Sequence, residues 1–227
     1  MTDANHHIEV LEDKNVFLFQ DHMSEASKNA AKECHVFANQ AATAEYHPKK
    51  QTAEWFDMYI QVMQQCGWLP INYELSQISD SNMKLDLSNL VGKGLQAAIG
   101  FISGNGAAGA LDLGKSIIST LANSEEAVEI LNRKSHEEDR TGLSLAKCDE
   151  SASGEVVMLL SAIQTDAEPD KDANYLLFKW SSSGTSNYTG SAALSLHRSL
   201  YEANRDVLIS RVHGNARATL LSLKLKR

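Results

Sequence analysis

Three glycines have the spacing of a dinucleotide-binding loop, since Gly104, Gly106 and Gly109 match Gly-x-Gly-x-x-Gly letter for letter. In nucleotide-dependent enzymes this loop follows a strand and begins a helix, whose N-terminal amides bind the pyrophosphate. Ala98 to Ser103 could be that strand, but Ser124 to Leu131 has helical spacing and no series of strand-helix units follows. A nucleotide-dependent enzyme is therefore the second alternative, and a turn inside a helical hairpin is favoured.

No other motif assigns a reaction. Ser195-x-His197 puts a nucleophile type and a base type on one face of a strand, a coincidence common in chains of this size. Cys34, Cys66 and Cys148 lack metal-like spacing, and the 8 histidines are dispersed. We expect Cys34 and Cys66 to be core residues and Cys148 to be the most exposed thiol. We predict no catalytic residue, no metal site and no cofactor, and the balance is against an enzyme.

Glycine and alanine are concentrated in the middle of the chain. Seven of its 13 glycines lie between Gly92 and Gly114, and the 18 residues from Gly94 to Leu111 carry no charge. Such small residues permit close backbone packing, turns or insertion into an apolar phase. Apolar residues at helical spacing on both sides of the 104–106 turn predict a Gly/Ala-rich helical hairpin.

The remaining chain predicts an α+β fold. Helical patterns cover Ser24 to Tyr46, with Ser24 as the N-cap, and Thr52 to Gly67, with Gly67 as the glycine that ends the helix. Beyond residue 141 the apolar period changes to two, which predicts a C-terminal antiparallel β-sheet with one further helix. We expect this helix to end at Gly214 and Ala218 to Leu225 to form a last strand. Residues 1–141 are thus a mainly helical region and 142–227 a mainly β region, packed as one compact unit.

Charge is unevenly distributed along the chain. The net charge is −8, yet the last 30 residues hold seven Lys and Arg against two Asp and Glu. A local excess of this kind attracts phosphates or an anionic membrane surface. Our candidates for an anionic-surface site are Arg198, Arg205, Arg211 and Arg217. Their wide spacing disfavours nucleic-acid binding.

The uncharged segment raises the question of membrane contact. A spanning helix needs about 20 predominantly apolar residues, so this glycine-rich stretch fails as a permanent anchor. In general character it resembles the Gly/Ala-rich segments of soluble toxins and fusion peptides, but for the segment by itself a tightly packed core hairpin is the favoured interpretation. The candidate membrane-interacting residues are Leu95, Ile99, Gly100, Phe101, Ile102 and Gly104.

Together these features predict a non-enzymatic membrane-active protein, toxin-like or virulence-associated, with a releasable hairpin. The alternative is a soluble protein–protein interaction module. The expected partner is membrane lipid or another protein, and oligomerisation is left open. Met1 to Val10 lacks the basic flank and apolar run of a signal peptide, so we expect synthesis in the cytoplasm, with leaderless secretion as a further route.

Overall fold

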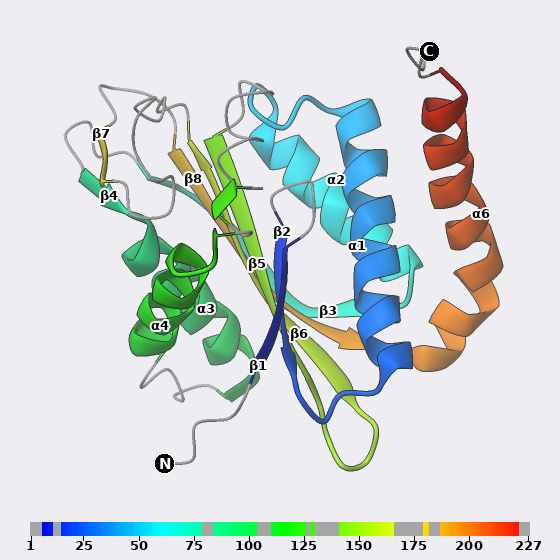
Figure 1. Cartoon of the computed structure of the whole chain (residues 1–227), viewed down its shortest axis with the longest axis horizontal. Coiled ribbons are helices and arrows are strands. Elements are labelled where there is room, and N and C mark those ends of the chain that lie inside the picture. The colour runs from blue at the N-terminus through cyan, green and yellow to red at the C-terminus, as the bar shows by residue number, and fades with distance from the viewer. Residues whose placement is uncertain are drawn as a thin grey trace. The chain divides into compact units, whose positions relative to one another are not determined.

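The structure, a computed structural model, describes residues 6–10, 15–78, 84–103, 110–125, 128–129, 141–165, 179–181 and 187–222 (Figure 1). The chain divides into two compact units, each built from two separate segments. The first unit contains Met1–Met23 and Pro70–Leu194, and the second contains Ser24–Leu69 and Ser195–Arg227. Each unit therefore combines a segment from residues 1–69 with a segment from residues 70–227.

A six-stranded mixed sheet is the centre of the first unit. Its strand order is β1-β2-β5-β6-β8-β3, with bounds β1 His6–Val10, β2 Asn15–Gln20, β5 Thr141–Glu150, β6 Val156–Thr165, β8 Asn187–Leu196 and β3 Trp68–Ile78. β5 and β6 pair antiparallel, as predicted. β2 is antiparallel to β1 but parallel to β5, with Val16 opposite Leu145. The α+β class is confirmed, and the N-terminal strands make the sheet mixed rather than purely antiparallel.

The central strands are buried on both faces. In β2, Val16 and Leu18 belong to a core cluster on one face, whereas Phe17 and Phe19 alternate to the other face and are also buried. The two phenylalanine rings stack with centroids 5.4 Å apart. Burial on both faces explains why this strand reads as an uninterrupted apolar run rather than an alternating one.

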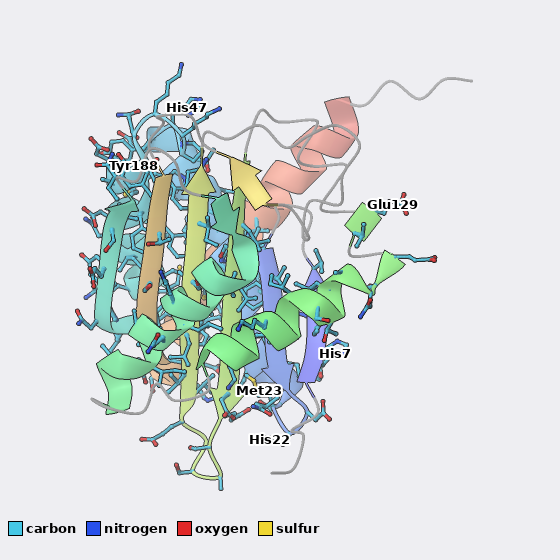
Figure 2. All side chains as sticks on the ribbon, turned by 90° about the vertical axis from the view of Figure 1, so that its left-hand side faces the viewer. His7, His22, Met23, His47, Glu129 and Tyr188 are labelled. Atoms are coloured by element: carbon cyan, nitrogen blue, oxygen red, sulfur yellow. The ribbon has the colours of Figure 1, made fainter. Side chains whose placement is uncertain are left out.

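The predicted helical hairpin is confirmed. Its helices are α3, Leu87–Ser103, and α4, Ala110–Ala122, and both lie against the same face of the sheet (Figures 1 and 2). α3 packs on β6 and on α4. Beside them, β4, Lys84–Asp86, pairs with β7, Lys179–Ser181, as a small antiparallel ribbon.

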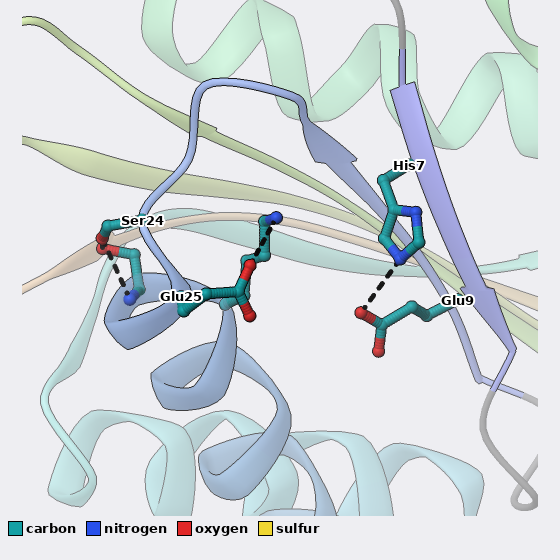
Figure 3. Close-up of polar contacts among 6 residues, drawn as sticks. His7, Glu9, Ser24 and Glu25 are labelled. Atoms are coloured by element: carbon teal, nitrogen blue, oxygen red, sulfur yellow. Dashed lines mark hydrogen bonds and ion pairs between the residues drawn. The ribbon is translucent and has the colours of Figure 1, made fainter.

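The described residues of the second unit form three helices, α1 at Glu25–Glu45, α2 at Thr52–Gln65 and α6 at Arg198–Ser222. Ser24 is the N-cap of α1, as predicted, and its side chain accepts a hydrogen bond from the backbone N–H of Ser27 (Figure 3). In the first turn the Lys28 ammonium lies 2.9 Å from the Glu25 carboxylate. α1 packs against both α2 and α6.

Two local predictions for the C-terminus are wrong. α6 does not end at Gly214 but continues to Ser222, so residues 218–222 of the predicted last strand are helical, and residues 223–225 lie outside the described residues. Alternating apolar and polar residues over so short a run do not exclude a helix. Once a helix is nucleated, each added residue contributes a hydrogen bond without a further nucleation cost.

Gly67 ends α2 and lies against α6. Its φ is +101°, and a Cβ at this position would lie 2.8 Å from the backbone nitrogen of Tyr201. The carbonyl oxygen of Gly67 also accepts a hydrogen bond from the N–H of His197 at 2.7 Å. Within the second unit, the end of α2 is thus in backbone contact with the start of α6, at a position that only glycine can occupy without strain.

We expect Gly67→Ala to lower the free energy of unfolding by about 3 kcal/mol, because overpacking adds to the strain of a positive φ. Gly154→Ala is the matched control, because Gly154 has a φ of +83° but open space where the Cβ would be. That variant should lose only about 1 kcal/mol, from backbone strain. Urea denaturation followed by circular dichroism measures both, and equal losses would contradict the packing argument.

Candidate functional site

The inner face of the α3–α4 hairpin is apolar. On α3, Val91, Leu95 and Ala98 recur at helical spacing and are buried. They form a single core cluster with the facing residues of α4 and the sheet, which include Ile117, Ile118, Leu121, Val16, Leu18, Leu143, Leu145, Leu159, Ile163 and Ala193. The hairpin therefore covers a continuous apolar surface of the sheet.

The outer face of the same hairpin is polar. Lys93 and Gln96 on α3 are exposed, as are Lys115, Ser119 and Thr120 on α4. Each helix thus separates a buried apolar stripe from an exposed face that carries a lysine. This is the pattern of a helix that can lie at a boundary between an apolar phase and water.

The six candidate membrane residues fall at the end of α3. Leu95 is fully buried in the core cluster, and Ile99 is partly buried and packs against it. Gly100, Phe101 and Ile102 belong to α3 by backbone, while the side chains of Phe101 and Ile102 lie outside what the structure describes, as does all of Gly104. Leu95 can meet lipid only if α3 leaves the sheet.

α3 makes its closest approach to the sheet at Gly94. A Cβ built on Gly94 would overlap the Ser161 hydroxyl of β6 and would lie 2.8 Å from the Ser161 Cβ. Ser161 is 2% exposed, and its Oγ has no hydrogen-bond partner among the residues that the structure describes. The sequence analysis placed Gly94 in a glycine cluster but did not identify Ser161. The signal that could have identified Ser161 is its hydroxyl within the otherwise apolar run Val156 to Ile163 of β6.

The structure contradicts the strand that the nucleotide-binding interpretation requires. Ala98 to Ser103 lies within helix α3, so the segment before the three glycines is helical and not extended. The glycines themselves, in 104–109, lie outside the described residues, and α4 follows them. A Rossmann-type loop needs a strand before its first glycine, and two flanking helices do not provide that geometry.

The candidate arginines do not act as one free cationic surface. The Arg205 guanidinium lies 3.2 Å from a Glu33 carboxylate oxygen on α1, and Arg198 donates to the Ser27 hydroxyl at 2.9 Å. Arg211 is exposed, whereas the side chain of Arg217 lies outside the described part of α6. Two of the four candidates therefore bind α1 within their own unit.

Arg205 belongs to a three-residue network. The Tyr201 hydroxyl donates to Glu33 at 2.7 Å and accepts from the Arg205 Nε at 3.0 Å. Burial, followed by the hydrogen bond to Glu33, raises the pKa of Tyr201, so its proton stays in place. The hydrogen bond with Tyr201, followed by the charge of Glu33, raises the pKa of Arg205. The network holds α6 on α1 with a fixed cation.

Two other sequence candidates have structural roles. Cys148 is buried rather than exposed, and this burial raises the pKa of its thiol, because the thiolate would lose its solvation. The expectation of an exposed thiol is therefore wrong. His197 accepts a hydrogen bond from the backbone N–H of Leu200 through Nδ1 at 3.2 Å, which satisfies an amide at the start of α6.

A pocket of about 330 Å³ lies on strands β5 and β6 and the turn between them. Its lining residues are Lys147, Asp149, Ser151, Glu155, Val157 and Leu159. This lining combines charged side chains of both signs with the apolar side chains of Val157 and Leu159. In the described residues no three His, Cys, Asp or Glu side chains form a group that could hold a metal ion. Among the helices described, none is both long and apolar enough to cross a membrane.

Comparisons with known proteins show only distant likeness. No protein-family model matches the chain, and no curated protein matches it. Among solved structures, one named delta-endotoxin is 14% identical over 87% of this chain and 89% of its own, with a TM-score of 0.47. The structure of the Evf virulence factor is 11% identical over 90% of this chain and 79% of its own, with a TM-score of 0.30. Likenesses at these values carry no argument about activity.

The Gly94 contact generates a double-mutant test. We expect Gly94→Ala to destabilise the protein, because an overpacking cost of roughly 1 to 3 kcal/mol exceeds the gain of about 1 kcal/mol from alanine in a helix. In a Ser161→Gly background the same substitution should be harmless or stabilising, because the nearest atom is then the residue 161 Cα at 3.4 Å.

Urea denaturation of the four proteins gives the coupling energy between the two positions. Ser161→Ala is a further control, which should leave stability unchanged or slightly raised because it removes a buried hydroxyl that has no partner. Additive effects at Gly94 and Ser161 would show that α3 and β6 are not in direct contact there.

Proposed function

We propose that this chain is a non-enzymatic membrane-active protein, toxin-like or virulence-associated, in which the α3–α4 hairpin leaves the sheet and inserts into the membrane interface. The contact between Gly94 and Ser161 is the observation that carries the proposal. There α3 covers a hydroxyl that has no described hydrogen-bond partner. A buried polar group of this kind costs about 1 to 3 kcal/mol, which is regained when water reaches it.

The released hairpin would have the composition that an interface requires. Its buried stripe, with Leu95 and Ile118 at its centre, would enter the acyl boundary, and Lys93 and Lys115 on the outer face would meet lipid headgroups. α3 has 17 residues. At 1.5 Å per residue that is about 25 Å, less than the roughly 30 Å of a hydrocarbon core. Insertion parallel to the surface therefore suits it better than spanning.

Electrostatics would control the approach to the membrane. The chain carries a net charge of −8, so an anionic surface repels it as a whole, while exposed cations such as Arg211 and Lys93 attract lipid phosphates locally. Arg198 and Arg205 contribute less, because they already bind partners on α1. Binding should consequently be weak until the net negative charge falls.

A disulfide lock between α3 and β6 tests the release step. In Gly94→Cys/Ser161→Cys the two Cβ atoms start 2.8 Å apart, and a disulfide needs about 3.5 to 4.5 Å, so a small outward shift of α3 closes the bond. We expect the oxidised variant to release little dye from anionic vesicles and dithiothreitol to restore release. Gly94→Ala, which loosens the same contact, should release more dye than the wild type.

The wild-type chain treated with the same oxidant controls for its own three cysteines. Intact mass measurement verifies the engineered bond, and circular dichroism verifies that each variant is folded. Dye release by the oxidised variant at the wild-type rate would show that α3 need not leave β6, and the hairpin mechanism would then be wrong.

We also expect dye release from anionic vesicles to increase between roughly pH 7 and pH 5. Histidine side chains gain positive charge over this interval. The chain's net charge is −8 with its 8 histidines counted as neutral, so positive charge gained on acidification makes the net charge less negative. The repulsion from anionic lipid then weakens as the pH falls. Vesicles of zwitterionic lipid are the control, since their release should depend less on pH. Intact anionic vesicles at every pH would exclude membrane activity.

A protein-binding module is the second candidate, favoured by one feature of the sheet. β3 is an edge strand, and its Ile71 and Tyr73 are 48% and 39% exposed on the same side of the strand. Edge strands with exposed apolar residues can accept a further strand from a partner. If vesicles stay intact at every pH, this edge becomes the surface to test.

A further inference from the structure

Two thiols meet inside the second unit. Cys34 lies on α1 and Cys66 is the C-cap of α2, and the two residues are 0% and 1% exposed. The Cys34 thiol donates to the carbonyl oxygen of Cys66 at 3.6 Å. A hydrogen bond to the Cys66 thiol, followed by burial, raises the pKa of Cys34. Residues that are 32 positions apart thus meet in the core, with the Cys34 sulfur against the backbone of Cys66.

The surrounding backbone holds this pair in place. The Trp68 indole donates to the Ala30 carbonyl oxygen at 3.4 Å, one helical turn before Cys34. Gly67, directly after Cys66, is held against the start of α6 through His197 and Tyr201. Both sides of the thiol pair are therefore anchored in packed helices. Two buried cysteines in contact are thus held at a fixed place between these helices.

We propose that Cys34 and Cys66 are a redox modification site, in which hydrogen peroxide converts the two thiols into an intramolecular disulfide. Peroxide is the class of oxidant best suited to this position, because it is small enough to reach a buried sulfur during local opening. The product would join α1 covalently to the C-terminal end of α2.

The chemistry proceeds in two balanced steps. The raised pKa makes Cys34 the weaker nucleophile. The Cys66 thiol therefore gives its proton to water during local opening, its sulfur attacks one peroxide oxygen, the O–O bond breaks, and a sulfenic acid and hydroxide form; the hydroxide takes up the released proton as water. The Cys34 sulfur then attacks the sulfenic sulfur, the S–S bond forms, and hydroxide leaves and takes the Cys34 proton as water. Overall, two thiols and one peroxide give one disulfide and two waters, with sulfur oxidised and peroxide reduced.

Cys148 is an internal comparison within the same chain. It is also fully buried, but the groups that shift its pKa besides burial are Lys147 and Asp149 rather than a cysteine. Burial alone would make Cys148 respond to peroxide as the pair does. A response confined to Cys34 and Cys66 is therefore a property of two thiols in contact.

The test treats the folded full-length chain with peroxide and maps its peptides by mass spectrometry. We expect a peptide pair linked through Cys34 and Cys66 with the loss of two hydrogens, while Cys148 remains reduced. Closure of a loop of this length should raise Tm by roughly 5 to 10 °C, reversed by dithiothreitol. The map uses the wild-type protein, so the result does not depend on any variant folding.

Two variants identify the mechanism. Cys34→Ser should leave the Cys66 sulfenic acid without its resolving thiol, so that dimedone labels Cys66. Cys148→Ser should form the Cys34–Cys66 bond at the wild-type rate. The proposal is overturned if Cys34 and Cys66 stay reduced under peroxide, or if Cys148 is oxidised as rapidly as they are.

Discussion

The close approach of α3 to β6 is the constraint on which the first unit depends. Leu95 and Ala98 reach the sheet only because Gly94 has no Cβ to hold the helix away from Ser161. The same approach buries the Ser161 hydroxyl without a described partner. This one contact therefore allows the apolar residues of α3 to be buried, and it also costs free energy because a hydroxyl is buried without a described partner. A local departure from good packing rules of this kind is typical of positions that have a function beyond stability.

In the second unit polar contacts at α1 set the arrangement. Glu33 binds Tyr201 and Arg205, and Ser27 binds Arg198, so the basic excess of the C-terminal segment is partly neutralised within its own unit. A count of charges along the sequence therefore overstates the cationic surface that a membrane could meet. What remains exposed is a smaller set, which includes Arg211.

Local signals predicted many elements because their causes are local. The cap at Ser24, the end of a helix at Gly67 and the two hairpin helices each depend on a few neighbouring residues, and all three predictions are confirmed. The apolar period also located Leu95 and Ile99 correctly on one helix. It did not show whether lipid or protein covers that helix, because both phases select the same side chains.

By itself the sequence determined the α+β class, the helical hairpin and the absence of a motif that would name a reaction. Only the tertiary structure decided that β2 pairs parallel with β5, that Ser161 lies beneath Gly94, and that Cys34 faces Cys66. It also extended α6 past Gly214. The physical reason is the separation in sequence of the residues that interact. Caps, turns and helical periods are set within a few residues, whereas pairings between distant segments depend on the shape and burial that both partners acquire only in the folded chain.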